Sequence, residues 1–426
     1  MRSPKPTVYG RLMATCLVLL AILASLGTTA YADPLSFNDA LALALRETPA
    51  LAATAAQTDA ARSAAIPAGE LPDPKLVLAI DNLPINTQDR FSLSRDFMTM
   101  RRIGIMQDFP NQDKREARVA VAQGRVALAE AQTQITRQRV LSETAVAWIG
   151  RDTVEQQLAY IDALREEIRL LEAAVRARLA GAKGMTAETV APRLEAAMIE
   201  ERRDAFEARR SQAIATLRRW IGPAANGALQ GSAPDWTITR ETLQQRLHQH
   251  PEIAAFDSKE HVLNAEIKEA QAEKKSDWSL EMAYQKRGAQ YSDMISIQAS
   301  FDLRLFTATR QDPMIAAKRA ERIGLDAERE ATLREHAAML DSDLADFERL
   351  TSMLKRQREV LLPLAEEKVD LAMADWQGGR GSLSDVIIAR RERIDAKLKL
   401  IEITGERSQM AARLYYAYGE QAGAKP

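Results

Sequence analysis

The sequence has little cysteine, little histidine and few aromatic residues, and each scarcity excludes a class of protein. Of its 426 residues, one is cysteine (Cys16), four are histidine and 5% are aromatic. Since Cys16 lies in a segment that we expect to be removed, the mature chain forms no disulfide framework. The net charge of −1 gives no indication of nucleic-acid binding. No catalytic triad or phosphate-binding loop accompanies the histidines, so we expect neither an enzyme nor a bound cofactor.

The first 32 residues have the composition of a secretory signal peptide. Three basic residues precede an apolar run over residues 12–26, and residues 30–32 read Ala-Tyr-Ala, which matches a signal-peptidase site. The apolar run is short for a membrane span. It continues past Cys16, whereas a lipoprotein signal places its cysteine directly after the run. We therefore expect an exported chain without a lipid anchor, beginning at Asp33 with 55 basic and 59 acidic residues and a net charge of −4.

Residues after 33 include no apolar run long enough for a transmembrane helix, but residues 278–306 alternate with period two. Each arm of this hairpin has about 8–12 residues, close to what a tilted strand needs to cross a bilayer. Aromatic residues mark both ends, as in interfacial girdles: Trp278 and Phe306 at the base, Tyr284 and Tyr291 near the turn. A half-buried soluble sheet is the alternative. The apolar register reads Trp278, Leu280, Met282, Tyr284, then Ile295, Ile297, Ala299, Phe301, Leu303 and Leu305.

A second, less regular hairpin covers residues 76–109. Its three methionines, Met98, Met100 and Met106, fall on the polar face. The turn around residues 82–86 is polar and contains proline. The residues expected on the apolar face are Leu76, Leu78, Ile80, Phe91, Leu93, Phe97, Ile103 and Ile105.

The chain repeats itself. Leu41, Leu45, Pro49 and Ala53 match Leu243, Leu247, Pro251 and Ala255 at an offset of 202, and Gly181 and Gly222 match Gly378 and Gly419 at an offset of 197. We therefore divide the chain after the signal peptide (1–32) into three parts. The first repeat is 33–222, with a β-hairpin at 76–109 and a helical hairpin at 113–221. An equatorial connector covers 223–250, and the second repeat is 251–426, with a β-hairpin at 277–306 and a helical hairpin at 313–418.

Long helices dominate each repeat, as the abundance of alanine and scarcity of proline favour. The first, about 113–178, would be about 100 Å long, and a return helix follows a glycine-containing turn. We expect the return helix and the Pro-led helix of the next repeat to stack end to end and match that length. Pro363 should bend the second long helix. One stripe of apolar residues on the first long helix has the spacing of a coiled coil: Val154, Leu158, Ile161, Ile168, Leu171, Val175 and Leu179.

The strand count implies an assembly. Four strands per chain are too few to close a barrel, for which about eight are needed, so several chains must share one. Helices of about 100 Å cannot fit within a bilayer about 30 Å thick and must project from it. The predicted fold is mostly α with a transmembrane β part, in two tandem repeats of helix, β-hairpin and long helical hairpin. The alternative is a soluble periplasmic coiled-coil protein with a structural or adaptor-like role.

The chain resembles the TolC family of outer-membrane efflux factors over nearly its whole mature length. The repeat and the segment Trp376-x-x-Gly379-x-x-Ser382-x-Ser384-Asp385-Val386-Ile387 resemble that family. The heavy-metal branch is resembled by three segments together: Leu71-Pro72-Asp73-Pro74-Lys75, Asp81-Asn82-Leu83-Pro84 and Phe97-Met98-Thr99-Met100. The resemblance implies a homotrimer in outer-membrane lipid, with a shared twelve-stranded β-barrel and a long periplasmic α-helical barrel. It implies two partners, a periplasmic adaptor protein and an inner-membrane pump of the resistance–nodulation–division type. The cargo would be heavy-metal cations, and drug or protein export through the same kind of conduit is the alternative.

The tips of the helical hairpins are the candidate sites. Asp385 and Glu188 lie one turn into helices, so threefold symmetry would make each an acidic ring that constricts the tunnel and favours cations. A carboxylate that complements the helix dipole is an equally good interpretation. The resemblance implies adaptor docking at both tips. The residues concerned are Trp376, Gly378, Gly379 and Gly381 in the second repeat and Gly181 and Gly184 in the first.

The sequence predicts no metal site. His248 and His250 are two residues apart and do not share a helix face. His261 and His336 stand alone in the sequence. The thioethers of Met98, Met100 and Met106 suit Cu(I) or Ag(I), but adaptable packing and lumen lining explain them better.

Overall fold

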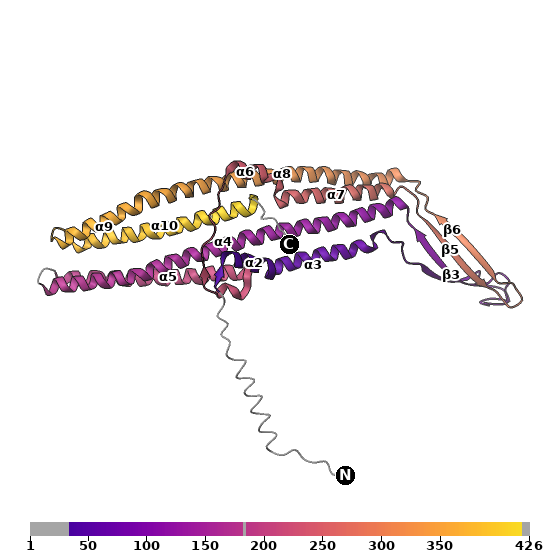
Figure 1. Cartoon of the computed structure of the whole chain (residues 1–426). Coiled ribbons are helices and arrows are strands. Elements are labelled where there is room, and N and C mark those ends of the chain that lie inside the picture. The colour runs from indigo at the N-terminus through magenta and orange to yellow at the C-terminus, as the bar shows by residue number, and fades with distance from the viewer. Residues whose placement is uncertain (1–33, 182–184, 420–426) are drawn as a thin grey trace, which may run out of the picture.

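The protein is an elongated bundle of helices with a small sheet at one end, as the computed structural model describes it over residues 34–181 and 185–419 (Figure 1). Helix α4 (Gln112–Ala180) has 69 residues and is therefore about 100 Å long. The described helices include none that is both long and apolar enough to cross a membrane. The predicted signal peptide (1–32) and Gly184 lie outside the described residues.

The two repeats have the same order of elements, so the predicted fold class is confirmed. The first repeat consists of β1 (Leu35–Ser36), α2 (Phe37–Glu47), α3 (Pro49–Ala65), a 3₁₀ turn (Ile66–Gly69), β2 (Lys75–Asp81), β3 (Met100–Phe109), α4, a 3₁₀ turn (Thr186–Thr189) and α5 (Val190–Ile221).

The second repeat follows a 3₁₀ turn (Gly222–Asn226) and β4 (Leu229–Gln230), which pairs with β1 in parallel. It consists of α6 (Arg240–Arg246), a 3₁₀ turn (Leu247–Gln249), α7 (Pro251–Ala272), β5 (Trp278–Lys286), β6 (Met294–Phe301), a 3₁₀ turn (Thr307–Thr309), α8 (Gln311–Arg356), α9 (Leu362–Gln377) and α10 (Leu383–Tyr418). A π-helical turn, Gln357–Leu361, joins α8 to α9 directly before Pro363. The missing N–H of proline accounts for the change in the hydrogen-bond ladder.

Local capping explains where the helices begin. Proline occupies the first position of α3 and of α7, where its missing N–H costs nothing. The Asn111 side chain accepts a hydrogen bond from the backbone N–H of Lys114 (2.9 Å) at the start of α4. The Ser36 hydroxyl does the same for Asp39 in α2 (3.1 Å). These starts are local in the sequence, which is why they could be predicted.

The two β-hairpins join into one antiparallel sheet with the strand order β2-β3-β5-β6. In the central pair, Ile103 lies opposite Tyr284 and Ile105 opposite Met282. The strands are shorter than predicted. The segment 91–97 is a loop, since Phe91 has a φ of +57° that ends extended structure. The second hairpin's last strand ends at Phe301, so Leu303 and Leu305 lie beyond it.

The return helices stack on helices of their own repeat, so the prediction that they stack on the next repeat is wrong. In the first repeat, the hydroxyl of Thr48 donates a hydrogen bond to the carbonyl oxygen of Trp220 (3.0 Å). Thr48 directly precedes α3, and Trp220 lies at the end of α5. In the second, the rings of His250, just before α7, and Tyr418, the last residue of α10, are 5.4 Å apart. The connector crosses between the layers and carries the chain to the second repeat (Figure 1).

The main core lies at mid-height, where the connector meets α4. The Phe37 ring packs edge-on against Trp148 (5.5 Å between ring centroids) and against Trp236 of the connector (5.6 Å). Arg151 is fully buried and donates to the carbonyl oxygens of Ala225 (2.8 Å) and Gly227 (2.7 Å). These contacts attach the connector to the helical body.

Candidate functional site

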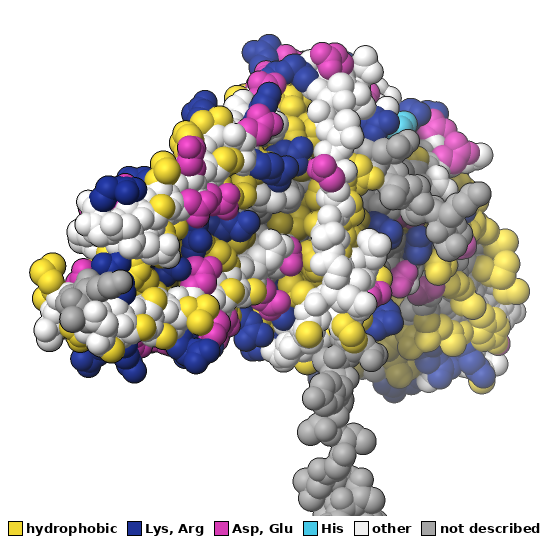
Figure 2. Space-filling view, turned by 60° about the vertical axis from the view of Figure 1, so that its left-hand side comes forward, with side chains coloured by type: hydrophobic (Ala, Val, Ile, Leu, Met, Phe, Trp, Pro, Cys, Tyr) yellow, Lys and Arg dark blue, Asp and Glu magenta, His cyan; other side chains and the backbone are white. Residues whose placement is uncertain are grey.

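One face of the four-stranded sheet is apolar across all its strands and open to the surroundings. Ile297 on β6 is 67% exposed, and Leu78 on β2 and Ile105 on β3 are similarly open. Hydrophobic side chains gather at the end of the molecule where the sheet lies (Figure 2). The exposed apolar residues of this face are Leu76, Leu78, Ile80, Ile103, Ile105, Trp278, Leu280, Met282, Tyr284, Ile295, Ile297 and Phe301.

The opposite face of the sheet is polar and internally bonded. Arg102 on β3 pairs with Asp81 on β2 (3.2 Å) and with Glu281 on β5 (3.3 Å). The Gln285 amide donates to the hydroxyl of Ser296 (3.2 Å). A sheet with one polar and one apolar face suits a boundary between water and hydrocarbon.

Aromatic rings close the apolar face at its helical end. Trp278 stacks on Phe109 with 4.2 Å between ring centroids, and Phe301 lies 6.4 Å from Trp278. Tyr284 stands near the turn end of β5 and is exposed. The sequence identified Trp278 and Tyr284; the stacking on Phe109 needed the register between β3 and β5.

The tips of the two helical hairpins pack against each other through Trp376. The Trp376 ring is only 2% exposed, and the Arg178 guanidinium of α4 lies 4.5 Å from its centroid. Arg178 also donates to the carbonyl oxygen of Trp376 (2.6 Å). Trp376 therefore supports the tip from behind instead of presenting a contact surface. The apolar residues around it are Leu171, Val175, Leu383, Val386 and Ile387.

The glycines at the tips make the chain reversals. Gly379 has a φ of +78°, the left-handed region that favours glycine. A Cβ on Gly381 would lie 3.1 Å from the Cβ of Asp375, so this turn is also tight. In the first repeat, Gly181 ends α4 and its N–H donates to the carbonyl oxygen of Ala177 (3.1 Å).

Asp385 and Glu188 both act as helix caps. The Asp385 carboxylate accepts from the backbone N–H (3.2 Å) and hydroxyl (2.7 Å) of Ser382, and these bonds lower the pKa of Asp385 below its usual value. The Glu188 carboxylate accepts from the backbone N–H of Met185 (3.2 Å). The helix-cap interpretation therefore applies to both residues, and Asp385 is exposed at the tip.

A groove of about 500 Å³ runs beside the tip of the second hairpin. Leu364 and Leu371 line it and are more than half exposed. The ion pair between Asp375 and Arg380 (3.1 Å) borders it, and Asp385 lies at its end. The two tips project side by side at the left of Figure 2.

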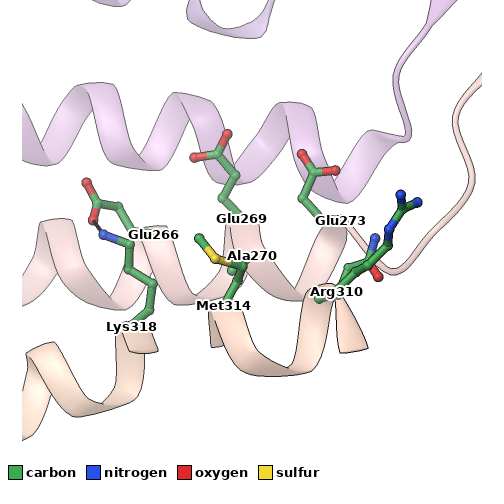
Figure 3. Close-up of a pocket in the computed structure, with 8 residues that line it drawn as sticks. Glu266, Glu269, Ala270, Glu273, Arg310, Met314 and Lys318 are labelled. Atoms are coloured by element: carbon green, nitrogen blue, oxygen red, sulfur yellow. Dashed lines mark hydrogen bonds and ion pairs between the residues drawn. The ribbon is translucent and has the colours of Figure 1, made fainter. Parts of the chain in front are cut away.

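A second hollow of about 440 Å³ lies between α7 and α8 near the sheet, with a row of glutamates along α7 (Figure 3). Each carboxylate is already paired with a basic residue. Glu266 pairs with Lys318 (2.9 Å) and Arg125 (3.3 Å), Glu269 with Arg118 (3.0 Å). Glu273 pairs with Lys114 (2.7 Å). The row therefore holds α7 to α4 and α8 instead of forming an open acidic site.

The structure separates the methionines and joins two of the histidines. Met100 and Met106 lie six residues apart on one strand, about 20 Å, and Met98 lies before that strand, so the three cannot share one ion. His248 and His261 are exposed. The rings of His250 and His336 are buried and 4.1 Å apart, a pairing that sequence reasoning missed.

The comparisons with known proteins bear on the fold. No protein-family model and no curated protein matches the sequence. Among solved structures, a membrane protein from Pseudomonas aeruginosa aligns with a TM-score of 0.76 at 16% identity, covering 90% of each chain. CusC, whose structures are described in connection with folding and transmembrane channel formation, aligns with a TM-score of 0.73 at 16% identity. The alignment covers 90% of this chain and 92% of CusC. The open-state MtrE outer-membrane channel of Neisseria gonorrhoeae aligns with a TM-score of 0.71 at 15% identity. That alignment covers 90% of this chain and 88% of MtrE.

The chain has the fold of outer-membrane channels. The alignments extend over nine-tenths of the chain, and so include most of both repeats. Identities near 15% establish the shared fold alone. What the chain does must therefore be argued from its own surfaces.

Proposed function

We propose that the chain is the outer-membrane channel of a tripartite efflux system, of the TolC family that its sequence resembles. The observation that carries this proposal is the sheet with a continuous, exposed apolar face at the end of a helical body about 100 Å long. Lipid is the occupant that such a face suits, because each pair of neighbouring strands presents matching apolar rows. The helices then extend into the periplasm.

The assembly is a homotrimer in this proposal. Strands β2 and β6 are the two edges of the described sheet, and each leaves a row of backbone groups without a strand partner. Such groups cannot remain unpaired in hydrocarbon. Pairing β6 of one chain with β2 of the next closes twelve strands from three chains into one barrel, and the helical bodies form the tunnel below it.

The helical tips bind the partners in this proposal. The groove lined by Leu364 and Leu371 offers apolar contact, and Asp375 and Arg380 flank it with charge. This combination suits a helix tip of a periplasmic adaptor, which connects the channel to an inner-membrane pump of the resistance–nodulation–division type. The turn glycines Gly378, Gly379 and Gly381 in the second repeat, and Gly181 in the first, shape these tips, and Trp376 supports them. Gly184, outside the described residues, belongs to the same predicted set.

The tunnel entrance is the proposed constriction. Three copies of Asp385, exposed at the tip, would form a ring of negative charge, and Glu188 would contribute from the neighbouring hairpin. The same carboxylates cap their helices, so their position is fixed by hydrogen bonds. The proposed cargo is heavy-metal cations, on the sequence resemblance of residues 71–75, 81–84 and 97–100 to the heavy-metal branch. Deleting the gene and measuring tolerance to a panel of metals and drugs separates the two kinds of cargo.

One pair of substitutions tests the membrane assignment. Ile297→Lys puts a charge on the apolar face and should cost about 2–4 kcal/mol if that face meets the middle of the bilayer. Ser296→Lys, on the adjacent residue but the opposite face, should be tolerated. The measurement is the fraction of protein that stays in the outer membrane after an alkaline wash and migrates as a heat-modifiable oligomer.

Equal behaviour of the two variants would contradict a lipid-facing sheet. A soluble periplasmic protein with a half-buried sheet is the alternative function, and it predicts that the wild type itself is released by the wash.

A further inference from the structure

The junction between α10 and α7 contains a group of side chains that the channel fold does not need. His250 ends the connector, Glu252 lies in the first turn of α7, and His336 lies in the middle of α8. Tyr418 ends α10. One potential ligand atom from each of His250, Glu252 and His336 lies within 4.8 Å of the others.

The first repeat has the same junction without these groups. Thr48 stands where the second repeat has His250, and its hydroxyl serves the joint by contacting the carbonyl oxygen of Trp220. At the same offsets, Ala50 stands for Glu252 and Ile221 for Tyr418. A helix joint of this shape therefore forms without histidine or carboxylate, so the fold alone does not explain them.

The two imidazoles are buried and already oriented. The Nε2 atom of His336 lies 2.9 Å from a carboxylate oxygen of Glu252, and its Nδ1 atom lies 3.3 Å from the hydroxyl of Tyr418. The Nδ1 atom of His250 accepts from the backbone N–H of Glu252 (3.3 Å), and its Nε2 atom lies 3.2 Å from the amide of Gln138. When Nε2 of His336 binds a metal, its Nδ1–H can donate to the Tyr418 hydroxyl and so fix the ring, as in protein metal sites. His250 would bind through Nδ1, in place of its hydrogen bond from the Glu252 N–H.

We propose that His250, Glu252 and His336 bind one divalent transition-metal cation of the zinc type per chain. Two imidazoles and one carboxylate are a ligand set that Zn²⁺ takes, with a fourth position left for water or Tyr418. Zinc ligands about 2.0–2.2 Å from the metal lie roughly 3.3–3.5 Å apart in a tetrahedron. The ligand atoms now lie within 4.8 Å of one another, so binding requires them to approach by at most about 1.5 Å.

The charge state suits a cation. Glu252 supplies a negative charge from the partly exposed side, which also gives a route of entry. The bound ion would link α7 to α8 where α10 ends. It is a resident ion at mid-height, distinct from any cargo, and the proposal stands whether or not the chain exports metals.

The test is zinc binding by the mature, tag-free protein in detergent. Equilibrium dialysis should find one tightly held Zn²⁺ per chain, and Co²⁺ in its place should give the visible absorption of a four-coordinate nitrogen and oxygen site. His250→Thr, which installs the residue of the first repeat, and His336→Asn should each weaken zinc binding by at least about 100-fold. Glu252→Gln changes a half-exposed side chain and should also weaken it, with the helical content unchanged.

The controls are His248→Ala and His261→Ala, which remove exposed histidines from the same segment and should leave binding unchanged. If a histidine variant does not fold, the cobalt spectrum of the wild type and the Glu252→Gln titration still decide. The proposal fails if the wild type binds no zinc, if the His250→Thr, His336→Asn double variant binds as well as the wild type, or if binding is lost with His248.

Discussion

Arg151 shows how a single residue attaches the start of the connector to the first repeat. It lies on α4 with no exposed side-chain surface, and its guanidinium donates to the carbonyl oxygens of Ala225 and Gly227 and to the carboxylate of Glu155. Ala225 and Gly227 lie at the point where the chain leaves the first repeat. A buried guanidinium of this kind is stable only because all these acceptors are present.

Arg151→Met should lower the free energy of unfolding by about 3 kcal/mol, because two buried carbonyl oxygens lose their donors. It should also make the connector 223–250 an early site of protease cleavage. The measurement is the thermal midpoint by circular dichroism together with limited proteolysis. Arg218→Met is the matched control: Arg218 donates to the Asn226 side chain in the same region but is exposed, and its loss should change little. Equal effects of both variants would show that the connector is not held by Arg151.

At the scale of the single element, local signals were predictable and distant ones were not. Pro49 and Pro251 mark helix starts in the sequence because their effect is confined to one turn. The positive φ of Phe91, which shortens the first hairpin, depends on a loop conformation that alternation does not reveal. His250 and His336 come together only because α7 packs along α8, and their sequence positions give no sign of it. The pairing of β3 with β5 likewise depends on contacts between the two repeats, which no local sequence pattern reveals.

The tip of the second helical hairpin gives a prediction at the same scale. Gly379→Val forces a β-branched residue to a φ of +78°, at about 1–3 kcal/mol of strain, and should reshape the turn. Gly379→Asn is the matched control, because asparagine tolerates this region. We expect the valine variant to lose adaptor binding in a pull-down and most of the efflux-dependent tolerance, while the oligomer still assembles. Normal tolerance in the valine variant would count against docking at this tip.

At the scale of the whole molecule, duplication organises the chain. The repeat read from the sequence gave the order of the elements, because each repeat keeps the same turns and starts. It did not give the partners of the helix ends: each return helix stacks on the Pro-led helix of its own repeat, through Thr48 in one and His250 in the other. The connector therefore crosses the bundle to reach the second repeat (Figure 1), a path that the sequence alone did not predict. The duplicated hairpins meet as one sheet with two edges, β2 and β6.

Disulfide trapping between those two edges tests the central claim most directly. Cys16 is the only cysteine of the sequence, so a Cys16→Ala chain with Ala79→Cys on β2 and a cysteine at Ser296, Gln298 or Ser300 on β6 has only the introduced pair. Within one sheet these strands are three strand spacings apart, about 14 Å, too far for a disulfide. We predict that, in outer membranes, one of these pairs gives covalent species of up to three chains, and that each single-cysteine variant gives none. Monomers alone from all three pairs, in protein that is folded and membrane-bound, would contradict a barrel shared between chains.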